Sequence, residues 1–310
     1  MIVQLIRRAR ATVAILVTFA VAIVSVPALA VDANIEMITT GTGAKQELRF
    51  KPQVGSTQTV DFIMKMSMEM SGPMPMKMDL PGMKLGMRTA VTSVAPNGDV
   101  TYSLEIIDSS VMGEGGDPNA RAMMEQQVKT MVGTKATITV DDMGYTKNAD
   151  FQPPAGAPPD LVANLQKSMD GSSAPLPREA VGVGAKWKLS QNVDENGLNV
   201  KQTAVYEVTK LTADSVVLSL AIDQTATPGP IADPKLPPGA VANLDKLAGN
   251  GKGTTTLAFG HPMVMDADLD LVIKTTMTMS MKADPAMGIP TDQSQTIDMS
   301  MGMATQVKRR

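Results

Sequence analysis

Apolar and polar residues alternate along much of this 310-residue chain, with the period of two that is typical of half-buried β-strands. Three segments show the alternation most clearly, and the apolar parity of each is rich in methionine. The apolar positions are Val60, Phe62, Met64, Met66, Met68 and Met70 in the first segment, Leu269, Leu271, Ile273, Met277, Met279 and Met281 in the second, and Ile297, Met299, Met301 and Met303 in the third. Most residues between them are polar, so each segment is predicted to be a strand with one buried face.

Two segments have helical spacing instead. In the first, Asp117 is a suitable N-cap, Pro118 suits the first helical position, and Gly133 ends the pattern. Its apolar residues share one helical face and are Ala120, Met123, Met124, Val128 and Met131. The second predicted helix spans residues 160–169 and is followed by Gly171.

The chain also shows signs of an internal duplication. Four short matches recur in the same order at a nearly constant spacing: Thr89-Ala90-Val91 with Thr203-Ala204-Val205, Ser103-Leu104-Glu105-Ile106 with Ser219-Leu220-Ala221-Ile222, Asp117-Pro118 with Asp233-Pro234, and Lys135-x-Thr137-x-Thr139-Val140 with Lys252-x-Thr254-x-Thr256-Leu257. Gly55 and Gly184 are predicted to mark the start of each copy. We expect two related β-rich halves, residues 31–170 and 171–310. Each half is too long to be one repeat of a solenoid.

Two arrangements of these halves fit the pattern. In one, both halves contribute strands to a single curved antiparallel sheet, half-barrel-like, that wraps around helices. In the other, they form two lobes joined near residues 171–177. A curved sheet has to cover or close its edges, and helices on its concave face would do so. The single sheet, within a mainly β fold with a few helices, is the preferred prediction.

The second half carries a local pattern, Leu176-Pro177-x-x-x-Val181-x-Val183-Gly184-x-x-Trp187 followed by Gly251-x-Gly253-Thr254. This pattern resembles one found in a family of uncharacterised exported bacterial proteins, over residues 176–275. The resemblance implies structural roles for a turn glycine, a strand-start tryptophan and a strand glycine, and it implies no activity. The predicted architecture is also similar to that of periplasmic lipoprotein carriers of the localisation-factor type.

The first 30 residues have the three parts of a secretory signal peptide. Arg7, Arg8 and Arg10 form a basic region, residues 12–26 are apolar, and Ala28-Leu29-Ala30 offers the small residues that a signal peptidase reads. The apolar run is short for a membrane span of about 20 residues. We therefore expect cleavage near Ala30, no transmembrane span in the mature chain, and a periplasmic or secreted location. Both general secretion and the twin-arginine route stay open.

Composition narrows the range of functions. Cleavage removes three arginines and moves the formal net charge from −3 to −6, which argues against nucleic-acid binding because that requires a basic surface. Without cysteine, the chain has neither disulfides nor thiol chemistry. No Gly-x-Ser-x-Gly, His-Glu-x-x-His or phosphate-loop motif is present, so no catalytic residue is assigned and an enzyme is not expected.

Methionine is the unusual feature, because sixteen of the 26 methionines fall within residues 64–87 and 277–303. One interpretation is core filling in a purely structural envelope protein, since methionine fills irregular space where aromatics are scarce. A second is an adaptable concave site for an apolar ligand or a lipidated partner. Its predicted lining residues are Phe62, Met64, Met66, Met68, Met70, Met277, Met279, Met281, Met299, Met301 and Met303. If the two ends of the mature chain pair, these methionines form one surface.

The third interpretation is an envelope Cu(I)-binding protein, because thioethers select Cu(I). Met74, Met76 and Met78 are its predicted ligands, since they lie in a proline-containing turn, residues 71–78, where regular strand pairing is expected to stop. No other cofactor is expected. Binding of an apolar ligand or partner by a non-enzymatic protein is the preferred prediction, and copper binding is the alternative.

Four further features have simpler interpretations. His261 lies in a Gly-His-Pro turn and is expected to be exposed, although the methionines that follow it make it a candidate metal ligand. Trp187 is expected to anchor the core. Asp266, Asp268 and Asp270 lack a calcium-loop glycine, so a solvated strand face is expected. Residues 308–310 are expected to be a frayed tail.

Overall fold

The computed structural model describes residues 34–72, 75–113, 118–154, 176–195, 198–231, 236, 240–281 and 292–310. The predicted signal peptide and the predicted helix at residues 160–169 lie outside the described residues. Within them the fold is mainly β, with the helix α2 (Pro118–Lys129).

Strands from both halves join one antiparallel sheet, which has 14 strands in the described residues. The first half supplies β1 (Asn34–Thr39), β3 (Thr57–Ser71), β4 (Met76–Asp79), β5 (Gly82–Val94), β6 (Val100–Met112), β7 (Lys135–Val140) and β8 (Thr146–Gln152). The second half supplies β10 (Lys186–Glu195), β11 (Leu198–Leu211), β12 (Ser215–Ala226), β13 (Gly229–Ile231), β14 (Ala240–Ala258), β15 (Val264–Met281) and β16 (Gln293–Arg309). A separate pair is formed by β2 (Thr42–Gln46) and β9 (Val181–Val183).

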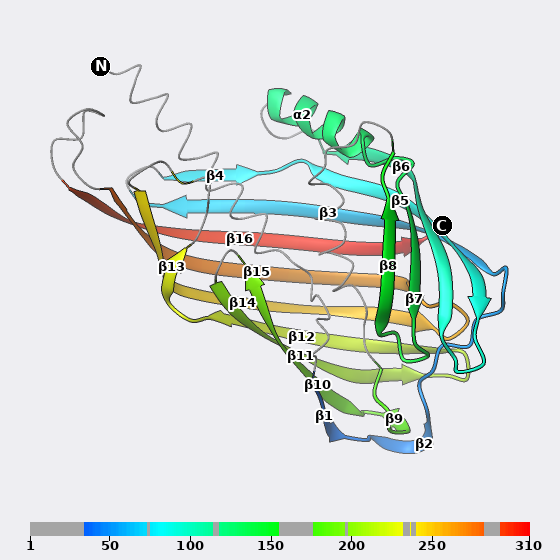
Figure 1. Ribbon diagram of the computed structural model, residues 1–310. Coiled ribbons are helices and arrows are strands. Elements are labelled where there is room, and N and C mark those ends of the chain that lie inside the picture. The colour runs from blue at the N-terminus through cyan, green and yellow to red at the C-terminus, as the bar shows by residue number, and fades with distance from the viewer. Residues whose placement is uncertain are drawn as a thin grey trace.

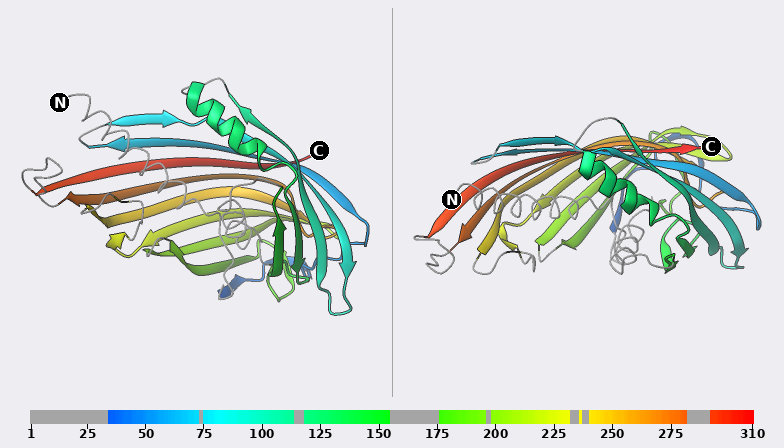
Figure 2. Two further views of the ribbon diagram at one scale, coloured as in Figure 1. Left: turned by 45° about the horizontal axis from the view of Figure 1, so that its top comes forward. Right: turned by 90° about the horizontal axis from the view of Figure 1, so that it is seen from above.

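The order of the large sheet is β1-β10-β11-β12-β14-β15-β16-β3-β5-β6-β7-β8, with β4 paired to β3 and β13 to β14. In Figure 1 the strands from β11 to β3 run across the view, whereas β5 to β8 run down its right side. Figure 2 shows from above that the sheet is arched. The predicted curved antiparallel sheet is therefore confirmed, and because both halves share it, the alternative of two separate lobes is wrong.

Strand pairing repeats between the halves. Gly55 donates its backbone N–H to Val91 of β5, and Gly184 donates in the same way to Val208 of β11, at 2.8 Å in both cases. Each valine precedes a bulge in the pairing with the next strand, β6 or β12. Both glycines have positive φ, which favours glycine at these starting positions. The sequence match of Val91 with Val205 is thus wrong by three residues, because the hydrogen bonds align Val91 with Val208.

The segment before β3 ties the halves together. The backbone N–H of Phe50 donates to the backbone carbonyl of Asp142, which follows β7. The backbone N–H of Lys51 donates to the carbonyl of Phe259, which follows β14, and both distances are 2.7 Å. The Arg49 guanidinium donates to the carbonyls of Pro177 and Arg178 at 3.0 and 2.8 Å. This one segment is therefore bonded to corresponding positions in both halves.

The core has two parts. A larger cluster covers one face of β10 to β16 and reaches β3, while a smaller cluster lies between β5, β6 and β7. The helix α2 packs against β6 and buries Val128, but Met123 is 73% exposed. Met123 was predicted to face the core and does not, because the buried strip of this helix is narrower than its apolar face.

Candidate functional site

The sheet brings the three methionine-rich strands together. β16 lies between β15 and β3, and three methionine pairs stand directly opposite each other across β16 and β3: Met299 with Met70, Met301 with Met68, and Met303 with Met66. Across the other side of β16, Met277 stands opposite Ile297. Opposed residues of an antiparallel pair share a face. As expected, β3 and β16 do pair although they lie far apart in the sequence, and their methionines form one surface.

This methionine surface faces the protein interior. Its central side chains are between 2% and 6% exposed, and they are Met68, Met70, Met277, Met299, Met301 and Met303. At its margin Met64, Met66, Met279 and Met281 are half-buried. Phe62 shares the face but packs with the smaller core cluster. The structure therefore places all the predicted lining residues on one face and packs most of them against the larger core.

The predicted metal turn is partly a strand. Met76 and Met78 belong to β4 and stand opposite Met70 and Met68 of β3. The prediction that regular pairing stops in residues 71–78 is wrong, because Pro75 and Pro81 flank β4 rather than interrupt it. Two rows of three methionines result, Met76–Met70–Met299 and Met78–Met68–Met301. Met74 lies outside the described residues.

A row of buried glutamines lies on the same face as the methionines. Gln191 of β10, Gln202 of β11 and Gln224 of β12 stand opposite one another and are between 3% and 5% exposed. Gln224 Nε2 donates to Gln202 Oε1 at 2.7 Å. Both polar atoms of Gln191, Nε2 of Gln202 and Oε1 of Gln224 have no partner in the described part of the chain. A buried polar atom without a partner costs about 1–3 kcal/mol, so this row marks where polar partners are expected.

The glutamines and methionines belong to one row that crosses eight strands. From β10 to β4 its members are Gln191, Gln202, Gln224, Gly249, Ile273, Met301, Met68 and Met78. With strands about 4.8 Å apart, the row extends for roughly 34 Å along the sheet. Gly249 leaves room for its neighbour, since a Cβ there would lie 2.6 Å from Gln224 Oε1. This row was not predicted from the sequence, although its signal is a glutamine at the apolar parity of three consecutive strands.

A groove of about 620 Å³ lies on the opposite, outer face of β15, β16 and β3. Outer-face residues line its base, and they are Lys65, Ser67, Asp270, Val272, Gly302 and Ala304. The turn at residues 79–82 and the end of β6 form its walls. Of the predicted lining residues, Met66 and Met303 border it. Its small and charged side chains set it apart from the apolar concave face.

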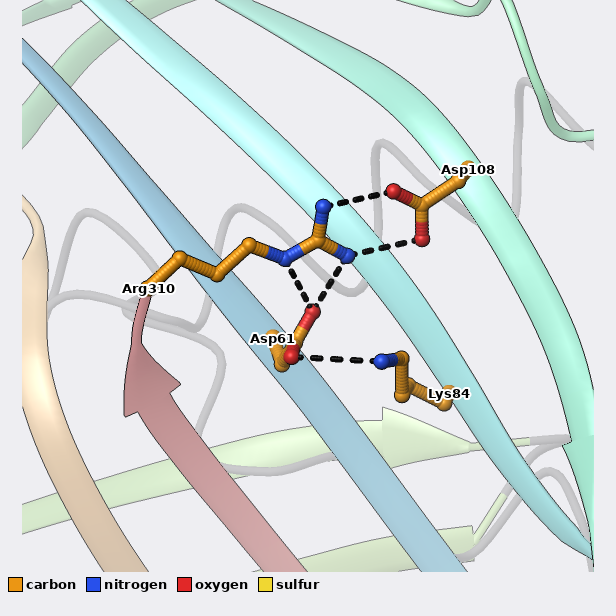
Figure 3. A network of polar contacts seen from close by, with 4 residues as sticks. All are labelled: Asp61, Lys84, Asp108 and Arg310. Atoms are coloured by element: carbon orange, nitrogen blue, oxygen red, sulfur yellow. Dashed lines mark hydrogen bonds and ion pairs between the residues drawn. The ribbon is translucent and has the colours of Figure 1, made fainter.

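Arg310 holds four strands together on that outer face (Figure 3). Its guanidinium donates to Asp61 Oδ1 at 2.6 Å and, through two nitrogens, to Asp108 at 2.6 and 2.8 Å. Lys84 Nζ lies 3.3 Å from the other oxygen of Asp61. Gly86 lies beneath this contact, because a Cβ there would meet Asp108 and Arg310. The prediction of a frayed tail is wrong, since β16 continues to Arg309 and Arg310 is bonded in this network.

These contacts shift the pKa values of the network. Burial raises the pKa of Asp61, but the hydrogen bonds and charges of Arg310 and Lys84 outweigh burial and hold it below its ordinary value. The hydrogen bond from Arg310 lowers the pKa of Asp108. The same hydrogen bonds, to Asp108 and then Asp61, raise the pKa of Arg310. The network is thus a fully charged clamp at neutral pH.

The remaining predicted features are structural. Trp187 is fully buried and stacks on Tyr206 with ring centroids 5.6 Å apart, which confirms its role as a core anchor. Asp266, Asp268 and Asp270 are exposed on the outer face of β15, as predicted. His261 is half-buried rather than exposed, and burial, followed by the charge of Arg309, lowers its pKa.

Two further features are absent from the described residues. No group of three or more His, Cys, Asp or Glu side chains in this part of the chain is arranged to hold a metal ion. Among the same residues, no helix has the length and apolar character needed to cross a membrane.

Neither the known family models nor the curated proteins match this chain, so the resemblance to exported bacterial proteins stays a prediction. Solved structures align with it weakly. OccK11 (OpdR) of Pseudomonas aeruginosa is 6% identical, and the alignment covers 85% of this chain and 100% of that one with a TM-score of 0.21. The outer membrane protein OmpT of Vibrio cholerae is 5% identical, with coverages of 82% and 100% and a TM-score of 0.18. TM-scores this low do not indicate a shared fold.

Proposed function

We propose that the mature protein is a non-enzymatic periplasmic or secreted protein that binds an apolar ligand or a lipidated partner against its methionine-lined concave face. The observation that carries this proposal is the set of three opposed methionine pairs across β3 and β16. Further methionines on β15 and β4 extend the same surface.

The choice of methionine supports binding over core filling alone. The chain uses branched aliphatic residues elsewhere on this face, as at Leu189, Leu218 and Ile222. Such side chains specify a core better, because they have fewer rotamers than methionine. A surface made of flexible thioethers re-packs around different shapes at little cost. Because the central methionines are buried, a ligand would enter by this re-packing rather than through an open cleft.

The proposal is tested with the apolar fluorophore N-phenyl-1-naphthylamine. We expect saturable binding to the wild-type protein and binding several-fold weaker in the double variant M68L/M301L. Leucine has nearly the volume and polarity of methionine, so each of the two substitutions should change the free energy of unfolding by less than about 1.5 kcal/mol. The matched control is M123L on the exposed face of α2. Absence of saturable binding to the wild-type protein would falsify the proposal.

Copper binding is the second candidate, and the row Met76–Met70–Met299 favours it. Three thioethers on adjacent strands are a donor set that suits Cu(I). Competition with bicinchoninate for Cu(I) tests this function. We expect stoichiometric Cu(I) uptake that is lost in M76L/M78L and kept in M123L. If wild-type protein takes no Cu(I) from the chelator, this candidate is excluded.

A further inference from the structure

The glutamine row offers hydrogen bonds without charge. Each amide has both donors and an acceptor, and four polar atoms of the row lack partners among the described residues. The neighbouring positions on this face of β10, β11 and β12 carry no charged side chain in the part of the chain described. They include Trp187, Leu189, Val200, Ala204, Tyr206 and Ile222.

We propose that this row is the polar end of the ligand site, and that it selects an apolar chain with an uncharged hydrogen-bonding headgroup over one with a free carboxylate. This inference rests on the proposed function. The row itself supplies the geometry, because it passes from three amides through Gly249 and Ile273 to Met301 and Met68 without leaving the concave face. A ligand lying along it meets amides at one end and thioethers at the other.

Headgroup selection follows from the cost of desolvation. A hydroxyl or ester group satisfies the unpartnered amides and is satisfied by them, so little hydrogen bonding is lost on burial. A carboxylate would be buried without a cation in this row and would have to bind a proton first. A site whose buried polar groups pair with one ligand discriminates against another that leaves them unpaired or brings in charge.

The experiment compares two competitors that share one acyl chain, monopalmitoylglycerol and palmitate, in displacing N-phenyl-1-naphthylamine at pH 7.5. We expect wild-type protein to prefer the glyceryl ester by about tenfold. In Q191L this preference should fall to about twofold. Gln191 makes no hydrogen bond to a described residue, so leucine breaks none there, and the thermal midpoint should stay the same or rise.

A matched control and a second variant keep the test decisive. T305V removes a different buried polar group without a partner, the Thr305 hydroxyl, which lies on the same face but outside the row. This variant should keep the tenfold preference. Q202L/Q224L removes the bonded pair together and should lose the preference as Q191L does.

The possible outcomes separate this inference from the proposed function. If wild type and both glutamine variants show the same preference between the glyceryl ester and palmitate, the inference is overturned. The amides would then bind water alone, and the proposed binding of apolar ligands would be unaffected. A preference for palmitate, or failure of both competitors to displace bound fluorophore, also overturns it alone. If the fluorophore itself does not bind, the proposed function fails and the inference fails with it.

Discussion

Arg310 shows how much one side chain contributes to this sheet. Its backbone N–H donates to the backbone carbonyl of Thr59 in β3. Its guanidinium passes over Gly86 of β5 and donates to Asp61 of β3 and Asp108 of β6. The contacts are partly exposed, with side-chain exposures of 33% for Arg310, 19% for Asp61 and 45% for Asp108. Solvent screening therefore limits their contribution to stability.

The variant R310Q should lose about 1 kcal/mol of unfolding free energy at pH 7, measured by urea denaturation. Because Arg310 holds the pKa values of Asp61 and Asp108 below 3.8, its contribution is complete above that pH. As the pH falls through the lowered pKa values, both carboxylates bind protons and the contribution disappears. The difference between wild type and R310Q should therefore shrink toward pH 2. R309Q is the control, and a loss of the same size in R309Q would contradict the assignment.

For single residues, the sequence predicts which face of a strand a side chain takes better than which residue it contacts. Trp187 and the three aspartates of β15 were placed correctly, because alternation and residue type determine which face a side chain takes. The glutamine row and the Arg310 clamp were missed. Both depend on which residues stand opposite across strands, and register is set by distant pairing that a single strand's pattern does not contain.

Among the strands of the large sheet, β14 packs closely against β15. Gly249, Gly251 and Gly253 alternate along it on the concave face, and at Gly253 a Cβ would lie 2.9 Å from the Leu269 Cα and closer still to the Asp268 carbonyl oxygen. Backbone atoms of β15 have little freedom to move away. The glycines therefore allow β14 and β15 to approach where the sheet is arched.

The substitution G253A should destabilise the protein by about 1–3 kcal/mol, because the added methyl group pushes β15 away from β14. Urea denaturation measures this loss. G229A, in the short strand β13, is the matched control, since a Cβ there meets nothing within 4 Å, and its effect should stay within about 0.5 kcal/mol. Equal effects of the two substitutions would show that the close approach is not real.

The positions of strands and helices in the sequence were easier to predict than which elements pair or pack together. Alternation identified β3, β15 and β16, and cap and stop residues identified α2. The pattern failed where prolines were taken to end pairing, since β4 fits between Pro75 and Pro81. It also failed at Met123, because amphipathicity alone does not say how much of a helix face its neighbours cover.

At the scale of the whole molecule, both halves share one hydrogen-bonded sheet and one connecting segment around Phe50. We expect them to unfold together. Trp187, the only tryptophan, reports on the second half, and far-ultraviolet circular dichroism reports on all strands. The two signals should give the same denaturant midpoint. Separate midpoints would show that the halves are independent units despite their shared sheet.

The position of β16 has a consequence for how the chain is delivered. This strand is late in the sequence but central in the sheet, and Arg310 bonds to Asp61, which is 249 residues earlier. Such a chain emerges from a ribosome or a translocation channel with its N-terminal end first. Until β16 has also emerged, one edge of β3 has no partner strand and the methionines of β3 are uncovered. Long-range pairing of this kind is slow and exposes the waiting strand to association with other chains. The exposed edge of β3 is covered only when β16 pairs with it.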